Sequence, residues 1–108
     1  MDEETIYRMQ AEFCKAISHP KRLLILEFLE KGEKSAGEIA KFIKSSFSST
    51  SQHIKILENK GMVGKKKKGT LVFYYLKHPE ILEASKIVRE VLKKTLQEKA
   101  FYIKKIKK

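Results

Sequence analysis

Residues 46–57 read SFSSTSQHIKIL and combine two patterns. Thr50, Ile54 and Leu57 recur at the spacing of one face of an α-helix. The remaining positions of the first two turns are mostly short and polar. We therefore expect a helix over 47–60 that buries one face and presents small hydrogen-bonding side chains on the other.

A second short helix is expected just before this one. The stretch SAGE at 35–38 fits a capping box, in which the serine hydroxyl and the glutamate satisfy each other's backbone amides. Apolar residues follow at 39, 40, 42 and 43, a polar break comes at 44–45, and Ser46 is a good N-cap for the next helix. Two short helices about three residues apart match the spacing of a helix-turn-helix.

Two further helices are predicted upstream. Asp2 is a good N-cap for the first, whose apolar residues fall on one helical face. Pro20 is well placed in the first turn of the second, and Lys31-Gly32 is a typical stop. Because the second helix is apolar over most of its circumference, we expect it to be the central helix of the core.

After Gly61 the apolar period changes from that of a helix to that of a strand. Residues 62–76 are expected to form a basic β-hairpin, or wing, with Lys68-Gly69 supplying the turn. Pro79 then starts the longest helix, whose apolar stripe continues to Ile106. A small domain cannot cover so long a stripe by itself, so a second subunit is the expected partner.

Composition limits the class of protein. A chain of 108 residues fits one domain, expected over residues 1–108. The longest apolar run, Leu71–Leu76, is far shorter than the ~18 residues that a membrane span needs. The single cysteine forms no internal disulfide, and no zinc site is expected within one chain. The sequence therefore predicts a cytoplasmic protein with no membrane partner.

The charge points to an anionic partner. The formal net charge is +11, and residues 34–77 hold ten bases against two acids. Positive charge concentrated in one segment is typical of a nucleic-acid surface. A lysine-rich surface with no specific partner is the plainer alternative. Arginine occurs only three times, so bidentate reading of guanine is not obviously available.

A recognition helix needs short polar side chains near its N-terminus, because its backbone approaches base edges closely. Gln52 can bond adenine through two hydrogen bonds, and serine can donate or accept. His53 has the alternative of a surface or core histidine, and the lysine run that of a solvated turn. The expected DNA-binding residues are Phe47, Ser48, Ser49, Ser51, Gln52, His53 and Lys55, with Lys65, Lys66, Lys67 and Lys68 in the wing.

Three segments, FCKAISHPKRLLIL at 13–26, SFSSTSQHIKIL at 46–57 and VFYYL at 72–76, resemble the ArsR/SmtB-like family of repressors. The resemblance implies a mainly α (α+β) fold, a winged helix-turn-helix. This fold would consist of about five helices, including a long C-terminal dimerisation helix, and a two-stranded hairpin wing. It further implies a homodimeric transcriptional regulator, a repressor, that binds double-stranded DNA at an inverted-repeat operator.

The chain departs from the family pattern at several positions. Lys44 and Ser45 stand where the family usually has a glycine and an apolar residue, and Thr70 where the wing often has arginine. Ser35 and Gly37 replace the Cys-x-Cys pair of soft-metal sensors. The long helix also lacks the Asp/His pairs of zinc-type sensors. No metal and no cofactor is therefore expected.

An effector and a dimer interface are the remaining expectations. Cys14 lies beside the apolar face of the first helix, where packing as a small buried residue is the main interpretation. A redox role between subunits, or an unknown small-molecule effector, is the alternative. The first and last helices would form the homodimer through Ile6, Met9, Phe13, Val88, Leu92, Leu96 and Ile103.

Two other functions remain open at this point. A sequence-indifferent architectural nucleic-acid-binding protein would use the same basic surface, and a winged helix for protein interactions would use it on an acidic partner. An enzyme is not expected, because no catalytic set, P-loop or dinucleotide motif is present. Lysine and glutamate, at 21 and 12, far outnumber asparagine plus glutamine, at four. That balance resembles thermophilic usage and suggests a thermophilic or archaeal source.

Overall fold

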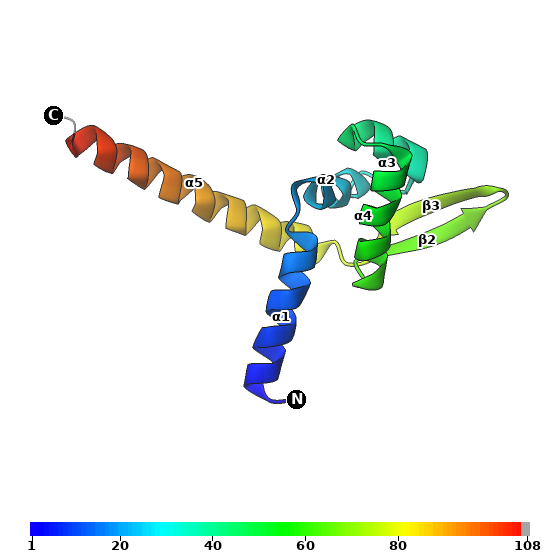
Figure 1. Ribbon diagram of the computed structural model, residues 1–108, viewed down its shortest axis with the longest axis horizontal. Helices are drawn as coiled ribbons and strands as arrows, with labels where there is room; N and C mark the ends of the chain where they lie inside the picture. The colour runs from blue at the N-terminus through cyan, green and yellow to red at the C-terminus, as the bar shows by residue number, and fades with distance from the viewer. Residues whose placement is uncertain (107–108) are drawn as a thin grey trace. The chain divides into compact units, whose positions relative to one another are not determined.

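The computed structural model describes residues 1–106, which contain five helices and three strands (Figure 1). They fall into two compact units, divided between His78 and Pro79. The first unit holds α1 (Glu3–Ile17), α2 (Pro20–Leu29), β1 (Lys34–Ser35), α3 (Ala36–Ile43), α4 (Phe47–Asn59), β2 (Val63–Lys68) and β3 (Leu71–Leu76). The second unit holds α5 (Glu80–Ile106).

The predicted helix starts are confirmed by their hydrogen bonds. Ser35 and Glu38 form the full capping box, with Glu38 N donating to Ser35 Oγ at 3.2 Å and Ser35 N to Glu38 Oε1 at 3.0 Å. Ser46 Oγ accepts from Ser49 N at 3.1 Å at the start of α4. Asp2 caps α1 in the same way. These caps satisfy amides that a helix start leaves without partners.

The start of α2 uses a cap that sequence reasoning did not predict. His19 Nδ1 accepts a hydrogen bond from Lys21 N at 3.1 Å, and Pro20 occupies the first turn as expected. A ring nitrogen can replace the serine or aspartate oxygen usual at this position. This bond fixes which nitrogen of His19 is the acceptor, so the other one carries the proton in the neutral ring.

The core is built around α2, as predicted. This helix packs against α3, α4 and β3. Burial of its apolar side chains supplies the main driving force for folding this unit. The most deeply buried residues of the three helices are Ile25, Leu26, Leu29, Ile39, Ile43, Thr50, Ile54 and Leu57.

The turn between α3 and α4 places a lysine in a left-handed conformation. Lys44 has φ 55° and ψ 50°, and it is the one non-glycine residue of 1–106 with positive φ. Its N–H donates to Lys41 O, and Ser45 N donates to Ala40 O. This closing pattern is usually made with glycine, because a Cβ is strained there. The helix-turn-helix thus forms although lysine replaces the usual glycine.

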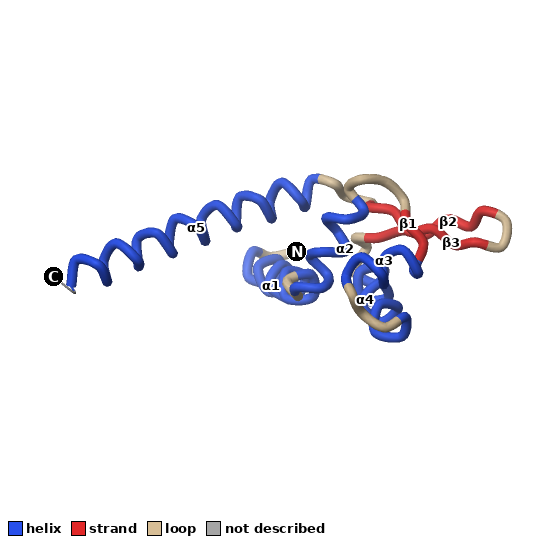
Figure 2. The backbone as a smooth tube through the Cα atoms, turned by 90° about the horizontal axis from the view of Figure 1, so that it is seen from above, coloured by secondary structure: helices blue, strands red, loops and turns tan. Residues whose placement is uncertain are grey.

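The hairpin differs from the prediction in two respects. Lys68 pairs with Leu71 inside the ladder, so the turn is Gly69-Thr70 and not Lys68-Gly69. The positive φ of Gly69, 63°, suits the first central position of a two-residue turn. In addition β1 joins β3, which makes a three-stranded antiparallel sheet in the order β1-β3-β2 where a two-stranded wing was expected (Figure 2). A two-residue strand has no alternation for a sequence pattern to reveal.

The second unit is a single long helix. α5 begins one residue after Pro79 and continues for 27 residues. Its predicted apolar stripe is largely exposed; Val88, for example, is 69% exposed. No helix within residues 1–106 is both long enough and apolar enough to cross a membrane.

Replacing Lys44 by glycine should stabilise the protein. The left-handed backbone costs a non-glycine residue roughly 1 kcal/mol, and the greater freedom of glycine in the unfolded chain takes back part of that gain. We expect the melting temperature to rise by a few degrees. The control, Lys41→Gly within α3, should lower it, because glycine costs about 1 kcal/mol in a helix. Thermal denaturation followed by circular dichroism measures both, and equal shifts would contradict the interpretation.

A second stabilising change lies in α4. Thr50 is fully buried, and its Oγ1 has no hydrogen-bond partner among the described residues. Thr50→Val keeps the shape and removes the unpaired hydroxyl, so the unfolding free energy should rise by about 1 kcal/mol. The same substitution at exposed Thr70 should leave the stability nearly unchanged. A loss of stability in Thr50→Val, measured by denaturant unfolding, would show that the hydroxyl has a partner in solution.

Candidate nucleic-acid interface

The outward face of α4 carries most of the residues predicted to read DNA. Ser48, Gln52 and Lys55 follow the i, i+4, i+7 spacing of one helical face, and all three are exposed. Phe47, in the first turn, is 64% exposed. Ser49 and Ser51 are half-buried. The helix is therefore anchored by one face and open along the other.

His53 is held by neighbours inside the first unit. It is half-buried, and Arg22 Nε donates to its Nδ1 at 3.2 Å. The rings of His19 and His53 lie 4.7 Å apart, centre to centre. Arg22 also donates to Ala16 O, at the end of α1. We call these three residues, Arg22, His19 and His53, the His–Arg cluster; it ties α4 to the junction of α1 and α2.

This environment keeps His53 neutral. Burial, followed by the nearby charges of His19, Arg22 and Lys21, lowers the pKa of His53 below its ordinary 6.5. The bond from Arg22 requires Nδ1 to be an acceptor, so Nε2 carries the proton. Sequence reasoning placed His53 among the DNA-binding residues without its partner Arg22. A contact of His53 with DNA stays a prediction.

The four lysines of the hairpin lie within β2 and point alternately to its two faces. Lys66 and Lys68 share one face with Phe73, and Lys65 and Lys67 share the other with Tyr74. Lys65 Nζ lies 3.9 Å from Glu58 Oε2, and Lys66 Nζ lies 3.6 Å from Glu33 Oε2. Lys68 is hydrogen-bonded to the same glutamate, Glu33. Lys67 has no ion pair among the described residues.

Aromatic rings of β3 support the lysine-bearing strand. The ammonium groups of Lys66 and Lys68 lie 6.0 Å and 5.4 Å from the ring centres of Tyr75 and Phe73. The Tyr75 ring also lies across Gly64, where a Cβ would come within 2.4 Å of it. An alanine there would displace the ring, so glycine is required for this packing. Charge and aromatic contacts together fix the direction in which these side chains extend.

The residues predicted for dimerisation lie on α1 and α5. Ile6 and Met9 of α1 are exposed and Phe13 is half-buried. On α5 the predicted residues are all exposed; they are Val88, Leu92, Leu96 and Ile103. Their assembly role stays a prediction.

Cys14 is exposed, and the expectation that it is buried within the chain is wrong. It follows Phe13 directly, so it lies about 100° around the helix from the apolar face. Ile17 is the one buried residue of α1. Exposure alone gives Cys14 no assigned role.

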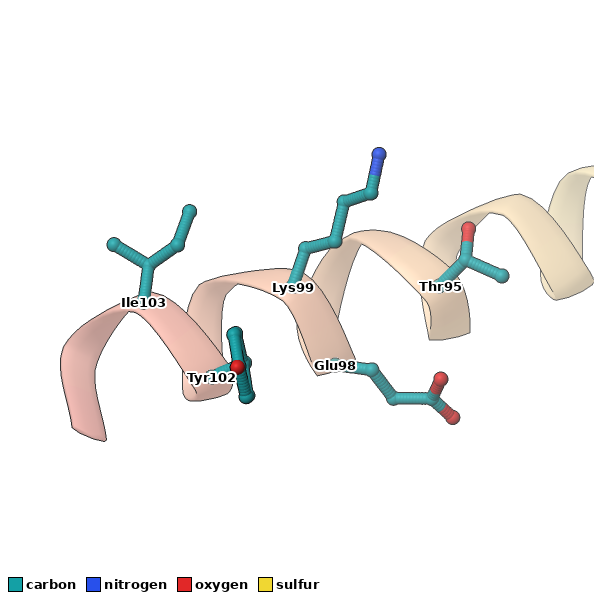
Figure 3. Close-up of a pocket in the computed structure, with 5 residues that line it drawn as sticks. All are labelled: Thr95, Glu98, Lys99, Tyr102 and Ile103. Carbon is teal, nitrogen blue, oxygen red and sulfur yellow. The ribbon is translucent and has the colours of Figure 1, made fainter. Parts of the chain in front are cut away.

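A metal site is absent from the described residues, and hollows lie on α5 and beside His19 and Arg22. Residues 1–106 contain no group of three or more histidine, cysteine, aspartate or glutamate side chains that could hold a metal ion. Figure 3 shows one hollow, whose lining side chains all come from a single stretch of α5. Because all the lining residues belong to one helix, they do not by themselves surround a ligand. Its residues are Thr95, Glu98, Lys99, Tyr102 and Ile103.

Comparison with known proteins agrees with this geometry. Residues 19–65 match the model of the arsR family of bacterial regulatory proteins. Over 100 residues the chain is 32% identical to Rv0081, an uncharacterized HTH-type transcriptional regulator of Mycobacterium tuberculosis, covering 92% of this chain and 88% of that protein. The crystal structure of M. tuberculosis Rv0081 superposes with a TM-score of 0.79 at 31% identity, covering 88% of this chain and 96% of the other.

Two further similarities are informative. A homodimeric winged helix-turn-helix DNA-binding domain of Mycobacterium bovis, solved by NMR, has a TM-score of 0.72 at 22% identity, covering 91% of this chain and 93% of the other. That likeness confirms the winged helix-turn-helix fold. The transcriptional repressor SdpR of Bacillus subtilis is 39% identical over 62 residues, which is 57% of this chain and 69% of that protein.

The His–Arg cluster predicts a pH-dependent stability. Because the pKa of His53 is lower in the folded chain than in the unfolded one, the unfolded chain binds more protons once the pH falls through about 6.5. The contribution of neutral His53 to the free energy of unfolding is fully present above that pH and is lost as the pH falls below it. We expect the melting temperature of His53→Gln to fall less than that of the wild type between pH 7.5 and pH 5.5.

The matched control is His78→Gln, which makes the same change outside the cluster and should follow the wild-type curve. Parallel curves for all three proteins would contradict a lowered pKa of His53 in the folded chain.

Proposed function

The chain belongs to the ArsR family of bacterial regulatory proteins, and from that premise we propose that it is a homodimeric repressor that binds an inverted-repeat operator. Family membership makes it a DNA-binding transcriptional regulator and not an enzyme. The observation that carries the finer proposal is the exposed polar face of α4, the second helix of the helix-turn-helix, beside a lysine-rich hairpin.

In this proposal α4 enters the major groove and reads bases. Gln52 is suited to the N7 and N6 positions of adenine, and Ser48 can donate to or accept from a base edge. The exposed ring of Phe47 is suited to the methyl group of thymine. Lys55, one turn further on, would contact a phosphate. These roles use the side chains that α4 leaves accessible.

The hairpin of residues 62–76 would supply affinity without sequence preference. Lysine binds phosphate as a point charge, and each phosphate neutralised makes log K fall by about 0.9 per log unit of salt. We place Lys65, Lys66, Lys67 and Lys68 in this role. Specificity would then come from α4 and from the use of two half-sites.

Dimerisation would double the reading surface. The exposed apolar residues of α5 offer surface that a second copy of the chain can bury, and Ile6 and Met9 of α1 are exposed as well. The M. bovis domain with the same fold is a homodimer. A two-fold dimer would present its two α4 helices to half-sites about one DNA turn, ~34 Å, apart.

Repression is the proposed outcome, supported by the name of the relative SdpR. A regulator bound across a promoter excludes polymerase without needing catalysis. Since its target is chromosomal DNA, the cytoplasm is the proposed location.

One observation favours a second candidate function. The α4 helix contains no arginine, the side chain that most often reads guanine, while the net charge is +11. A sequence-indifferent architectural protein would show the same balance of charge over base contacts.

Binding to two duplexes separates these functions. The duplex upstream of the chain's own gene and a random duplex of equal length are titrated across about 50–300 mM salt, with the oligomeric state measured by light scattering. A dimer that prefers the upstream duplex by about a hundredfold or more supports the repressor. Equal affinities that weaken together with salt would overturn it in favour of the architectural protein.

Two variants separate base reading from charge. Gln52→Ala should lower affinity for the upstream duplex by roughly 5- to 100-fold and leave the random duplex nearly unchanged. Lys67→Gln should weaken both duplexes alike and make the salt dependence shallower by about one unit for each subunit. A uniform effect of Gln52→Ala would remove that residue from the base-reading set.

A further inference from the structure

We infer that Glu33 is a residue that tunes DNA affinity: its carboxylate holds Lys66 and Lys68 and limits the part of the affinity that is independent of sequence. The inference rests on the proposed function, because it concerns the hairpin in its phosphate-binding role. It adds a residue that lies outside both α4 and the hairpin.

The fold brings Glu33 to one face of the hairpin. It lies two residues before Ser35, and Ser35 pairs with Phe73 in the β1–β3 ladder. Phe73 in turn pairs with Lys66, so Ser35, Phe73 and Lys66 lie on one face of the sheet. Glu33 Oε2 is 3.6 Å from Lys66 Nζ, and Glu33 Oε1 accepts a hydrogen bond from Lys68 Nζ.

The Glu33 side chain is half-buried, whereas the lysines are exposed. The Glu33 side chain is 28% exposed, against 56% and 53% for Lys66 and Lys68. The hydrogen bond from Lys68, with the nearby charge of Lys66, lowers the pKa of Glu33 below its ordinary value. Glu33 is thus ionised at neutral pH and faces two cations that solvent and DNA can also reach.

The charge of the hairpin is therefore smaller than its sequence suggests. On one face of the hairpin, Glu33 forms ion pairs with Lys66 and Lys68. On the other face, Glu58 forms an ion pair with Lys65. Lys67 alone has no ion pair among the described residues. A phosphate that approaches Lys66 or Lys68 has to compete with a carboxylate already in place.

That competition acts on one component of binding. Exposed ion pairs are weak, so Glu33 reduces the gain from a phosphate contact without preventing it. Base contacts from α4 do not pass through Glu33. The carboxylate therefore weakens binding to operator and random DNA by a similar factor, so Glu33 sets how tightly any duplex is held while α4 sets the ratio of the two affinities.

The test is Glu33→Gln in the full-length chain, titrated with the upstream duplex and the random duplex. We expect the affinities for both duplexes to rise by the same factor, roughly 3- to 10-fold, and the salt dependence to steepen by about one to two units per dimer. The matched control is Glu3→Gln, at the first residue of α1, a helix that contributes no residue to the hairpin. It makes the same change in net charge and should leave both quantities nearly unchanged.

A second comparison tests the coupling directly. Lys66→Gln and Lys68→Gln together should weaken random-duplex binding less in the wild type than in the Glu33→Gln background. Equal losses in the two backgrounds would overturn the inference. So would a Glu33→Gln protein that melts like the wild type but binds both duplexes more weakly, since Glu33 would then position the lysines for DNA.

The two proposals fail differently. If the wild type prefers the upstream duplex and Glu33→Gln behaves like Glu3→Gln, the repressor stands and the role of Glu33 falls. If the wild type binds neither duplex at low salt, both are overturned.

Discussion

The packing of α4 onto α2 and α3 through Thr50, Ile54 and Leu57 is the contact on which the other features depend. One face of a short helix supplies all of that anchorage, so the opposite face can remain polar and exposed. The helix would be marginal by itself, because 13 residues are few for an isolated helix in water. The cap at Ser46 holds its N-terminus in place, and the contact of His53 with Arg22 holds its middle.

Much of this arrangement follows from local chemistry and could be predicted. Caps at Asp2, Ser35 and Ser46, the stop at Gly61 and the buried face of α4 are all encoded within a few residues of where they act. The identification of the family rested on similarly local motifs. The exposed polar face of α4 is visible in the sequence for the same reason.

The features that escaped prediction depend on residues far apart in the chain. Glu33 meets Lys66 and Lys68 across more than thirty positions, and Arg22 meets His53 across a similar gap. In the sequence the four lysines of the hairpin are indistinguishable. Only the register of the sheet determines on which face each one lies and which carboxylate, if any, it meets. The strand β1 is too short to leave a periodic signal, and exposed Cys14 had a sequence neighbour that suggested burial.

Ser35 belongs to two elements at once, since it ends β1 and caps α3. The sheet that carries the hairpin is therefore joined to the helix-turn-helix without an intervening loop. This direct connection holds the spacing between α4 and the hairpin nearly fixed. A duplex that contacts both elements has to adopt the groove width and curvature that fit this spacing. The free energy of that deformation depends on the DNA sequence. Base pairs that no side chain touches would therefore influence which site is bound.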